Sequence, residues 1–127
     1  MFNITNVKLN FVREPLLAPF GFKGGHLDEL WQILVRVEDE DVFGIGVGVQ
    51  SVLWSDAEIF ASHSQCGGNT LMFLITEYAA NMIRGKSFDP PFDVLDFVRE
   101  DAIEYAKKIT GREELRETFV MNACADA

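Results

Sequence analysis

The segment FGIGVG, residues 43–48, places three glycines where a phosphate-binding loop would be sought first. A dinucleotide-binding loop has the spacing G-x-G-x-x-G and opens a helix directly after a strand. Gly44, Gly46 and Gly48 have a period of two instead, so all three lie on one face of a strand. We therefore predict no nucleotide site here, and a glycine face on which another backbone or a helix packs closely.

His63 and Cys66 lie close together in HSQC, and Cys124 is the one further cysteine. Structural zinc takes four ligands, which this set does not supply, so we predict no metal site. A small hydrolase built on Cys66 and His63 stays as an alternative that needs an activating geometry the spacing does not indicate. For the chain itself we therefore predict no catalytic residue. Two cysteines indicate reduced thiols in a cytoplasmic protein.

Charge and composition narrow the class of protein and of partner. The 127 residues carry a formal net charge of −9 and are 48% hydrophobic, which suits one domain with a packed core. So acidic a surface disfavours nucleic acid and anionic membranes as partners. The start, MFNITNVKLNF, lacks the basic and apolar regions of a secretory signal.

Alternating apolar residues dominate the first fifty residues and predict strands at about 2–13, 29–38 and 42–50. The acidic run at 38–41 is short enough to be the turn of an antiparallel hairpin, although four acids together could also hold a cation loosely. Residues 14–29, EPLLAPFGFKGGHLDE, contain two prolines and three glycines, and we predict a mobile loop there.

After Leu53 the apolar period becomes helical and predicts helices at about 55–63, 70–84, 91–110 and 112–125. Ser55 and Glu58 have the spacing of a capping box, with Trp54 and Ile59 placed for a hydrophobic staple. Asn69 or Thr70 is expected to cap the second helix, and Gly85 and Gly111 to follow the second and third. The predicted fold class is α+β, a three-stranded antiparallel meander followed by three to four helices.

The order of these segments resembles the N-terminal capping domain of the enolase superfamily, in the branch of mandelate racemase and muconate lactonizing enzyme. The segments that carry the resemblance are ITNVKLNFVREPLLAPF, GFKGG, LWQILVRVED, FGIGVG and the late RETFVMNA. Together they cover nearly the whole chain. One position departs from the family, which often has a glutamate just after the last glycine of the third strand, where this chain has Val47 or Val49.

The resemblance implies a division of labour between two domains. In the family the capping domain closes over a barrel that holds Mg²⁺ and the acid–base residues, and the reactions are racemisation, epimerisation, cycloisomerisation or dehydration of carboxylate substrates. Because those residues are absent here, we expect the chain to be inactive alone. The ending FVMNACADA has no helix cap, so we expect the chain to be truncated where a barrel domain begins.

The resemblance also implies two lid loops that reach the substrate, residues 19–25 and 50–54. From these loops we predict five substrate-contacting residues: Phe20, Phe22, Lys23, Ser51 and Trp54. The phenylalanines would supply apolar walls, and Lys23 would attract a distal anionic group. The partners are then the barrel of the same polypeptide and a small carboxylate.

A stand-alone binding or assembly module without enzymatic activity is the main alternative. Such a module would use the open sheet face and the phenylalanine-rich loop, and a homo-oligomer is expected where apolar surface stays exposed. A natural chain end at Ala127 would favour this alternative over the capping domain.

Overall fold

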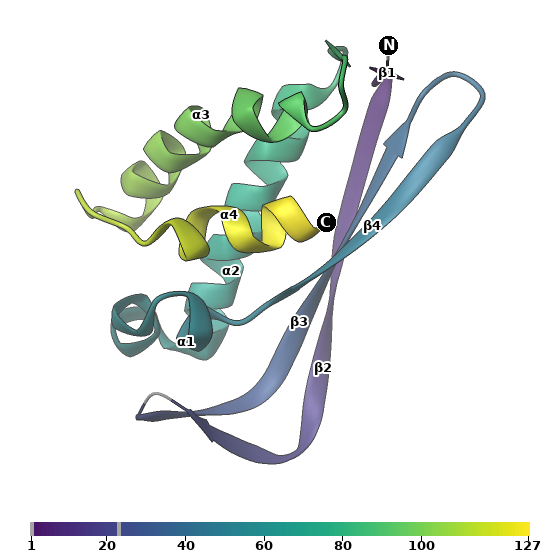
Figure 1. Cartoon of the computed structure of the whole chain (residues 1–127). Coiled ribbons are helices and arrows are strands. Elements are labelled where there is room, and N and C mark those ends of the chain that lie inside the picture. The colour runs from purple at the N-terminus through teal and green to yellow at the C-terminus, as the bar shows by residue number, and fades with distance from the viewer. Residues whose placement is uncertain (1, 23) are drawn as a thin grey trace.

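The computed structural model describes residues 2–22 and 24–127, without the side chains of Phe22 and Ala123. A meander of three strands comes first and helices follow, which confirms the predicted α+β class (Figure 1). The elements are β1 Phe2–Asn3, β2 Asn6–Phe22, β3 Gly25–Glu38, β4 Phe43–Gln50, α1 Val52–Ser55, α2 Ala57–Ile83, β5 Ser87–Phe88, α3 Asp93–Thr110 and α4 Glu117–Asp126.

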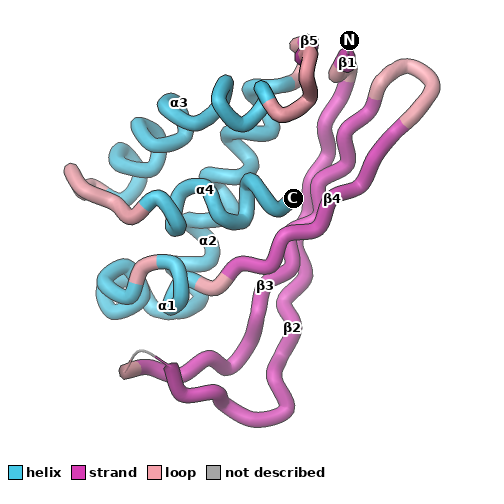
Figure 2. Tube along the Cα trace, in the orientation of Figure 1, coloured by secondary structure: helices cyan, strands magenta, loops and turns pink. Residues whose placement is uncertain are grey.

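The main sheet has the strand order β2-β3-β4 with both pairs antiparallel, and the helices lie on one of its faces (Figure 2). The inward side chains of β3 include Trp31, Ile33 and Val35, all of them buried. A second small sheet joins β1 to β5, so the N-terminal segment lies beside the connection between α2 and α3. No helix of the described residues lies on the opposite face of the main sheet (Figure 2).

The register of β4 against β3 places the glycines on the inner face. Gly48 pairs with Ile33, Gly46 with Val35 and Gly44 with Val37. A Cβ atom at Gly46 would overlap the carbonyl oxygen of Ala127 at the end of the chain. The glycine face thus admits a backbone that any larger residue would exclude, which confirms the interpretation made from the period-two spacing.

Much of residues 14–29, for which the sequence predicts a loop, is instead the outer part of a long hairpin formed by β2 and β3. Pro15 pairs with Glu29, and the register shifts between Pro15 and Phe20 before pairing resumes at Leu27. Proline is accommodated because β2 is an edge strand, where its missing N–H is not required. Short β1 also divides the first predicted strand, since residues 4 and 5 belong to neither β1 nor β2.

The predicted capping box is wrong by one residue. Asp56, not Ser55, is the N-cap of α2, and its carboxylate accepts hydrogen bonds from the amides of Glu58 and Ile59. Ser55 belongs to the single turn α1, so the proposed staple partner Trp54 lies within α1 and not before a cap. A carboxylate cap serves the helix N-terminus as well as a hydroxyl does.

The predicted break between two helices is a kink within one element. Ser64 has φ 70° and ψ 171°, which are not helical, yet α2 extends to Ile83. Asn69 therefore does not cap a helix, because its side chain accepts from the amide of Val52 instead. Gly85 follows the helix with φ 79°, a conformation that glycine adopts at low cost.

The last two helices complete the helical layer. Gly111, with φ 69°, ends α3 as predicted. In contrast, α4 starts at Glu117, five residues after the predicted start, because residues 112–116 form a connection whose Arg112 side chain reaches back to α2. One cluster of buried apolar residues lies between the sheet, α2 and α3, and another lies among the four helices.

Candidate functional site

The tip of the β2–β3 hairpin reaches the turn between β4 and α1, at the end of the molecule farthest from the hairpin turn of β3 and β4 (Figure 1). A Cβ atom built on Gly25 would lie 3.2 Å from Cδ2 of Leu53 and 2.9 Å from Cε1 of Phe60. The amide of Asp28 donates to Oε1 of Gln65 at 3.0 Å. The two segments that sequence predicts as separate lid loops therefore form one continuous surface.

Asn69 fixes the turn that follows β4. Its Oδ1 accepts from the amide of Val52 at 3.0 Å, and its carbonyl oxygen accepts from Nε2 of Gln50 at 2.5 Å. All three residues are buried. Asn69 thus bonds to both sides of Ser51, and it holds the turn to α2 with hydrogen bonds that are shielded from water. Sequence reasoning placed Asn69 at a helix cap and missed this role.

A polar and aromatic brace supports the hairpin just before its tip. Nε and Nη2 of Arg13 donate to Oε1 of Glu29 at 3.0 and 2.7 Å, and Nε1 of Trp31 donates to the same oxygen at 3.0 Å. The hydrogen bond from Arg13 is the main reason why the pKa of the Glu29 carboxyl lies below its ordinary value of 4.5. Phe11 stacks on Trp31 with ring centroids 4.6 Å apart. The brace lies next to the register shift and so sets the direction of the tip.

The predicted contact residues fall on both parts of this surface. Phe20 lies on the hairpin and Trp54 on α1, with 57% and 46% of their surfaces exposed. Ser51 is the N-cap of α1, and its hydroxyl has no hydrogen-bond partner among the described residues. Lys23 lies outside the described residues, and for Phe22 only the backbone is described. Their contact with a substrate remains a prediction.

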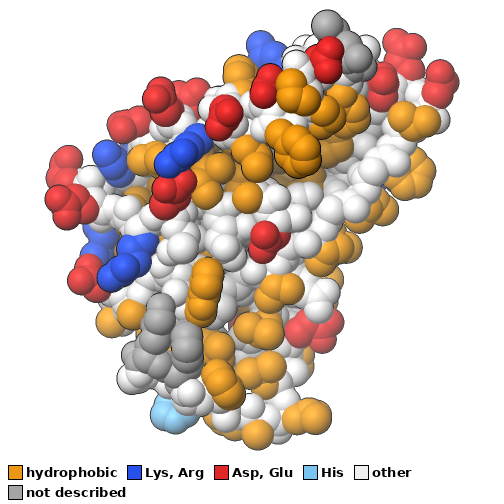
Figure 3. Space-filling model, in the orientation of Figure 1, with side chains coloured by type: hydrophobic (Ala, Val, Ile, Leu, Met, Phe, Trp, Pro, Cys, Tyr) orange, Lys and Arg blue, Asp and Glu red, His pale blue; other side chains and the backbone are white. Residues whose placement is uncertain are grey.

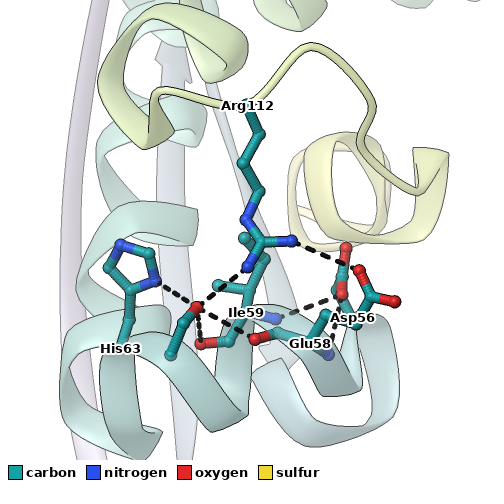
Figure 4. A network of polar contacts seen from close by, with 6 residues as sticks. Asp56, Glu58, Ile59, His63 and Arg112 are labelled. Carbon is teal, nitrogen blue, oxygen red and sulfur yellow. Dashed lines mark hydrogen bonds and ion pairs between the residues drawn. The ribbon is translucent and has the colours of Figure 1, made fainter.

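A second polar network joins α2 to the connection between α3 and α4 (Figure 4). Arg112 donates to Oε2 of Glu58 and to Oγ of Ser62, while Nδ1 of His63 lies 2.8 Å from the same hydroxyl. The Ser62 hydroxyl also contacts the carbonyl oxygen of Glu58 at 2.9 Å. Each of these groups bonds within the domain, so the network acts as a clamp between helices. It gives no support to a hydrolase built on His63.

The two cysteines are free thiols in different surroundings. Cys66 is exposed on α2, whereas burial raises the pKa of Cys124 to about 11. Cys124 lines an apolar pocket of about 310 Å³ between β3 and helices α2, α3 and α4. A thiol with so high a pKa stays protonated near neutral pH, so Cys124 is a poor nucleophile.

The residues that the structure describes contain no group of three or more histidine, cysteine, aspartate or glutamate side chains placed to hold a metal ion. In the acidic turn, Glu38 pairs with Arg36 at 2.8 Å and with Lys8 at 3.7 Å. The carboxylates present therefore do not fit the Mg²⁺ site that the family uses. None of the described helices has both the length and the apolar character that crossing a membrane requires.

Among known proteins, this chain is similar to solved structures only. No family model matches the chain, and no curated protein does. A mandelate racemase/muconate lactonizing protein from Herpetosiphon aurantiacus superposes with a TM-score of 0.55 and 16% identity, over 92% of this chain and 27% of that one. The L-Ala-D/L-Glu epimerase from Bacillus subtilis gives a TM-score of 0.46 and 17% identity, over 84% of this chain and 26% of that one.

At 16% identity the first superposition shows a shared fold, and the second is too weak to add to it. The resemblance expected from the sequence is thereby confirmed at the level of the fold. The chain spans about a quarter of the length of the solved structures that it matches. The activity and substrates of any larger protein are therefore matters for proposal.

Proposed function

We propose that this chain is the capping and specificity domain of a Mg²⁺-dependent enzyme of the enolase superfamily. The observation that carries the proposal is the close approach of Gly25 to Leu53, where an added Cβ atom would lie 3.2 Å from Cδ2 of Leu53, so that the hairpin tip adjoins the start of α1. A fold shared with a mandelate racemase/muconate lactonizing protein supports it. The substrate class is a small carboxylate, and the reaction is a racemisation, epimerisation, cycloisomerisation or dehydration.

The domain's own part is to cover and select. Phe20 and Trp54 present apolar surface at the tip and at the turn, and such surface shields a bound substrate from water. The Ser51 hydroxyl is buried beside this surface and has no hydrogen-bond partner among the described residues. Asn69 fixes the β4–α1 turn, and the Arg13–Glu29 pair supports the hairpin before its tip. Mg²⁺ and the proton-transfer groups belong to a barrel domain outside these residues.

The first test asks whether the chain is inactive alone. The purified 127-residue chain is incubated with Mg²⁺ and a panel of 2-hydroxy acids and dipeptides in D₂O, and exchange of the α-proton is followed by NMR. We expect no exchange, because no described cluster of residues is placed to hold the metal. Exchange catalysed by the chain without any added domain would refute the proposal.

The second test examines specificity in the complete polypeptide that contains this chain. We expect Trp54→Ala and Phe20→Ala to change the ratio of kcat/KM between two substrates by about tenfold or more, as the loss of an apolar contact does. Phe92→Ala is the matched control, since Phe92 is an exposed aromatic residue beside α3, away from the tip. Equal effects of all three substitutions would argue against a lid at the hairpin tip.

A further inference from the structure

The outer face of β4 is an apolar stripe. Phe43, Ile45, Val47 and Val49 point away from the helices with 58%, 59%, 50% and 46% of their surfaces exposed. In the space-filling view apolar side chains follow this strand along one edge of the molecule (Figure 3). Soluble proteins seldom leave a contiguous row of large apolar side chains open to water, and such rows mark interaction surfaces.

The two edges of the main sheet differ in their protection. On β2, Arg84 donates from Nη2 to the carbonyl oxygen of Val7 at 2.7 Å, and Pro15 and Pro19 interrupt the row of free amides. Lys8 and Arg13 add charge along the same strand. Charges and prolines are the usual means by which an edge strand avoids pairing with another chain. From Phe43 to Gln50, β4 has neither.

The sequence of β4 suits pairing with its own copy. In an antiparallel pair related by a two-fold axis through Gly46, Phe43 lies opposite Val49 and Ile45 opposite Val47, while Gly44 faces Gly48. Every cross-strand pair on the outer face is then apolar, so no like charges lie opposite each other on that face. A chain with a net charge of −9 repels its copy over most of its surface, so an uncharged segment is where two copies approach at least cost.

The size of the stripe sets the expected strength. Four half-exposed side chains bury less surface than the about 800 Å² per partner of a standard interface. Main-chain hydrogen bonds between the two edges add to the apolar contact. From the small apolar contact and the added main-chain hydrogen bonds together, we expect a reversible dimer that forms at micromolar concentrations.

We infer that β4 is a homodimerisation strand, which pairs antiparallel with β4 of a second copy to form a continuous six-stranded sheet. The inference uses only the edge and outer face of β4. The glycine face of the same strand stays turned toward the helices within each copy.

The test compares two lysine substitutions by sedimentation equilibrium, from low micromolar to several hundred micromolar chain. Val47→Lys places a charge in the centre of the stripe. Val12→Lys is the matched control, because Val12 is 45% exposed on the other edge strand and the substitution changes the net charge equally. We expect wild type and Val12→Lys to dimerise with similar constants, and Val47→Lys to weaken dimerisation at least tenfold.

A second measurement on the wild-type chain keeps the test independent of how well Val47→Lys folds. Amide exchange at residues 43–50 is compared at low and high chain concentration, and we expect slower exchange at high concentration, because strand pairing engages the free edge amides. A wild-type chain that stays monomeric throughout refutes the inference. So do equal effects of the two lysines, or a dimer without added protection in β4.

Discussion

The two faces of β4 differ although they belong to the same eight residues. On the inner face Gly46 accepts the end of the chain so closely that a Cβ atom would overlap Ala127, and Gln50 is fully buried. On the outer face Ile45 and Val47 are half exposed. The distribution of side-chain size follows what lies opposite each face. The inner face of β4 is packed against other parts of the chain, whereas the outer face has the apolar composition of an interaction surface.

The largest expected effect is the difference in unfolding free energy between truncating a buried isoleucine and truncating an exposed isoleucine, which lie on opposite faces of the sheet. Ile33 is fully buried opposite Gly48, while Ile45 is 59% exposed on the outer face. We expect Ile33→Ala to lower the free energy of unfolding by about 2–5 kcal/mol, and Ile45→Ala to change it by no more than about 0.5 kcal/mol in the monomer. Urea denaturation at low chain concentration measures both. Similar costs would mean that the outer face is covered in the monomer.

The next test adds bulk to the glycine face. Gly46→Val meets the backbone of Ala127, so we expect a loss of about 1–3 kcal/mol in the free energy of unfolding from overpacking. Gly44→Val is the control, since a Cβ atom there meets nothing within 4 Å. That change should be neutral or slightly stabilising, because valine favours a strand more than glycine does. If both variants unfold alike, Gly46 is not where the end of the chain packs.

A third test extends the comparison to the end of β4, where the strand enters the turn to α1. Asn69→Ala leaves the buried amide of Val52 without its acceptor, and we expect a loss of about 1–3 kcal/mol. Thr70→Ala removes a neighbouring exposed hydroxyl and should have little effect. Thermal unfolding followed by circular dichroism compares the two. Equal melting temperatures would remove the role assigned to Asn69.

The smallest expected effect concerns acid and the brace at the hairpin tip. The pKa of Glu29 in the folded state lies below its ordinary value of 4.5. Its ion pair with Arg13 therefore contributes fully to stability above pH 4.5, and this contribution is lost as the pH falls through the lower, folded-state pKa. Wild type should therefore exceed Glu29→Gln in stability at neutral pH, and the difference should vanish in acid. Urea midpoints between neutral and acid pH measure it. A difference that stays constant with pH would assign the effect to packing alone.

Local patterns in the sequence identified much of this fold, and contacts distant in sequence account for what they missed. The alternation of Trp31, Ile33 and Val35 and the glycine after α3 depend on neighbouring residues, and both features were found. Pro15 and Pro19 were wrongly interpreted as strand breakers. An edge strand tolerates proline, but the position of β2 at the sheet edge is a property of the whole fold that local sequence does not reveal.

The candidate site shows the same limit. Both segments were predicted as lid loops from the family resemblance, but the close approach of Gly25 to Leu53 brings together residues 28 positions apart. The partner of Asn69 was missed for a related reason, since its amide turns toward Val52 and not toward its own helix. The Arg13–Glu29 brace joins the two ends of the segment predicted to be a loop, and its opposite charges were a signal that could have been followed.

The acidic hairpin turn between β3 and β4 has a consequence for the newly synthesised chain. Before the helices form, residues 42–50 are an uncharged, mostly apolar stretch without proline, and such a segment can associate with another copy while it is exposed. The run Glu38-Asp39-Glu40-Asp41 directly precedes that stretch and keeps nascent copies apart by charge repulsion. High salt screens this repulsion, so the yield of refolding should fall as the salt concentration is raised.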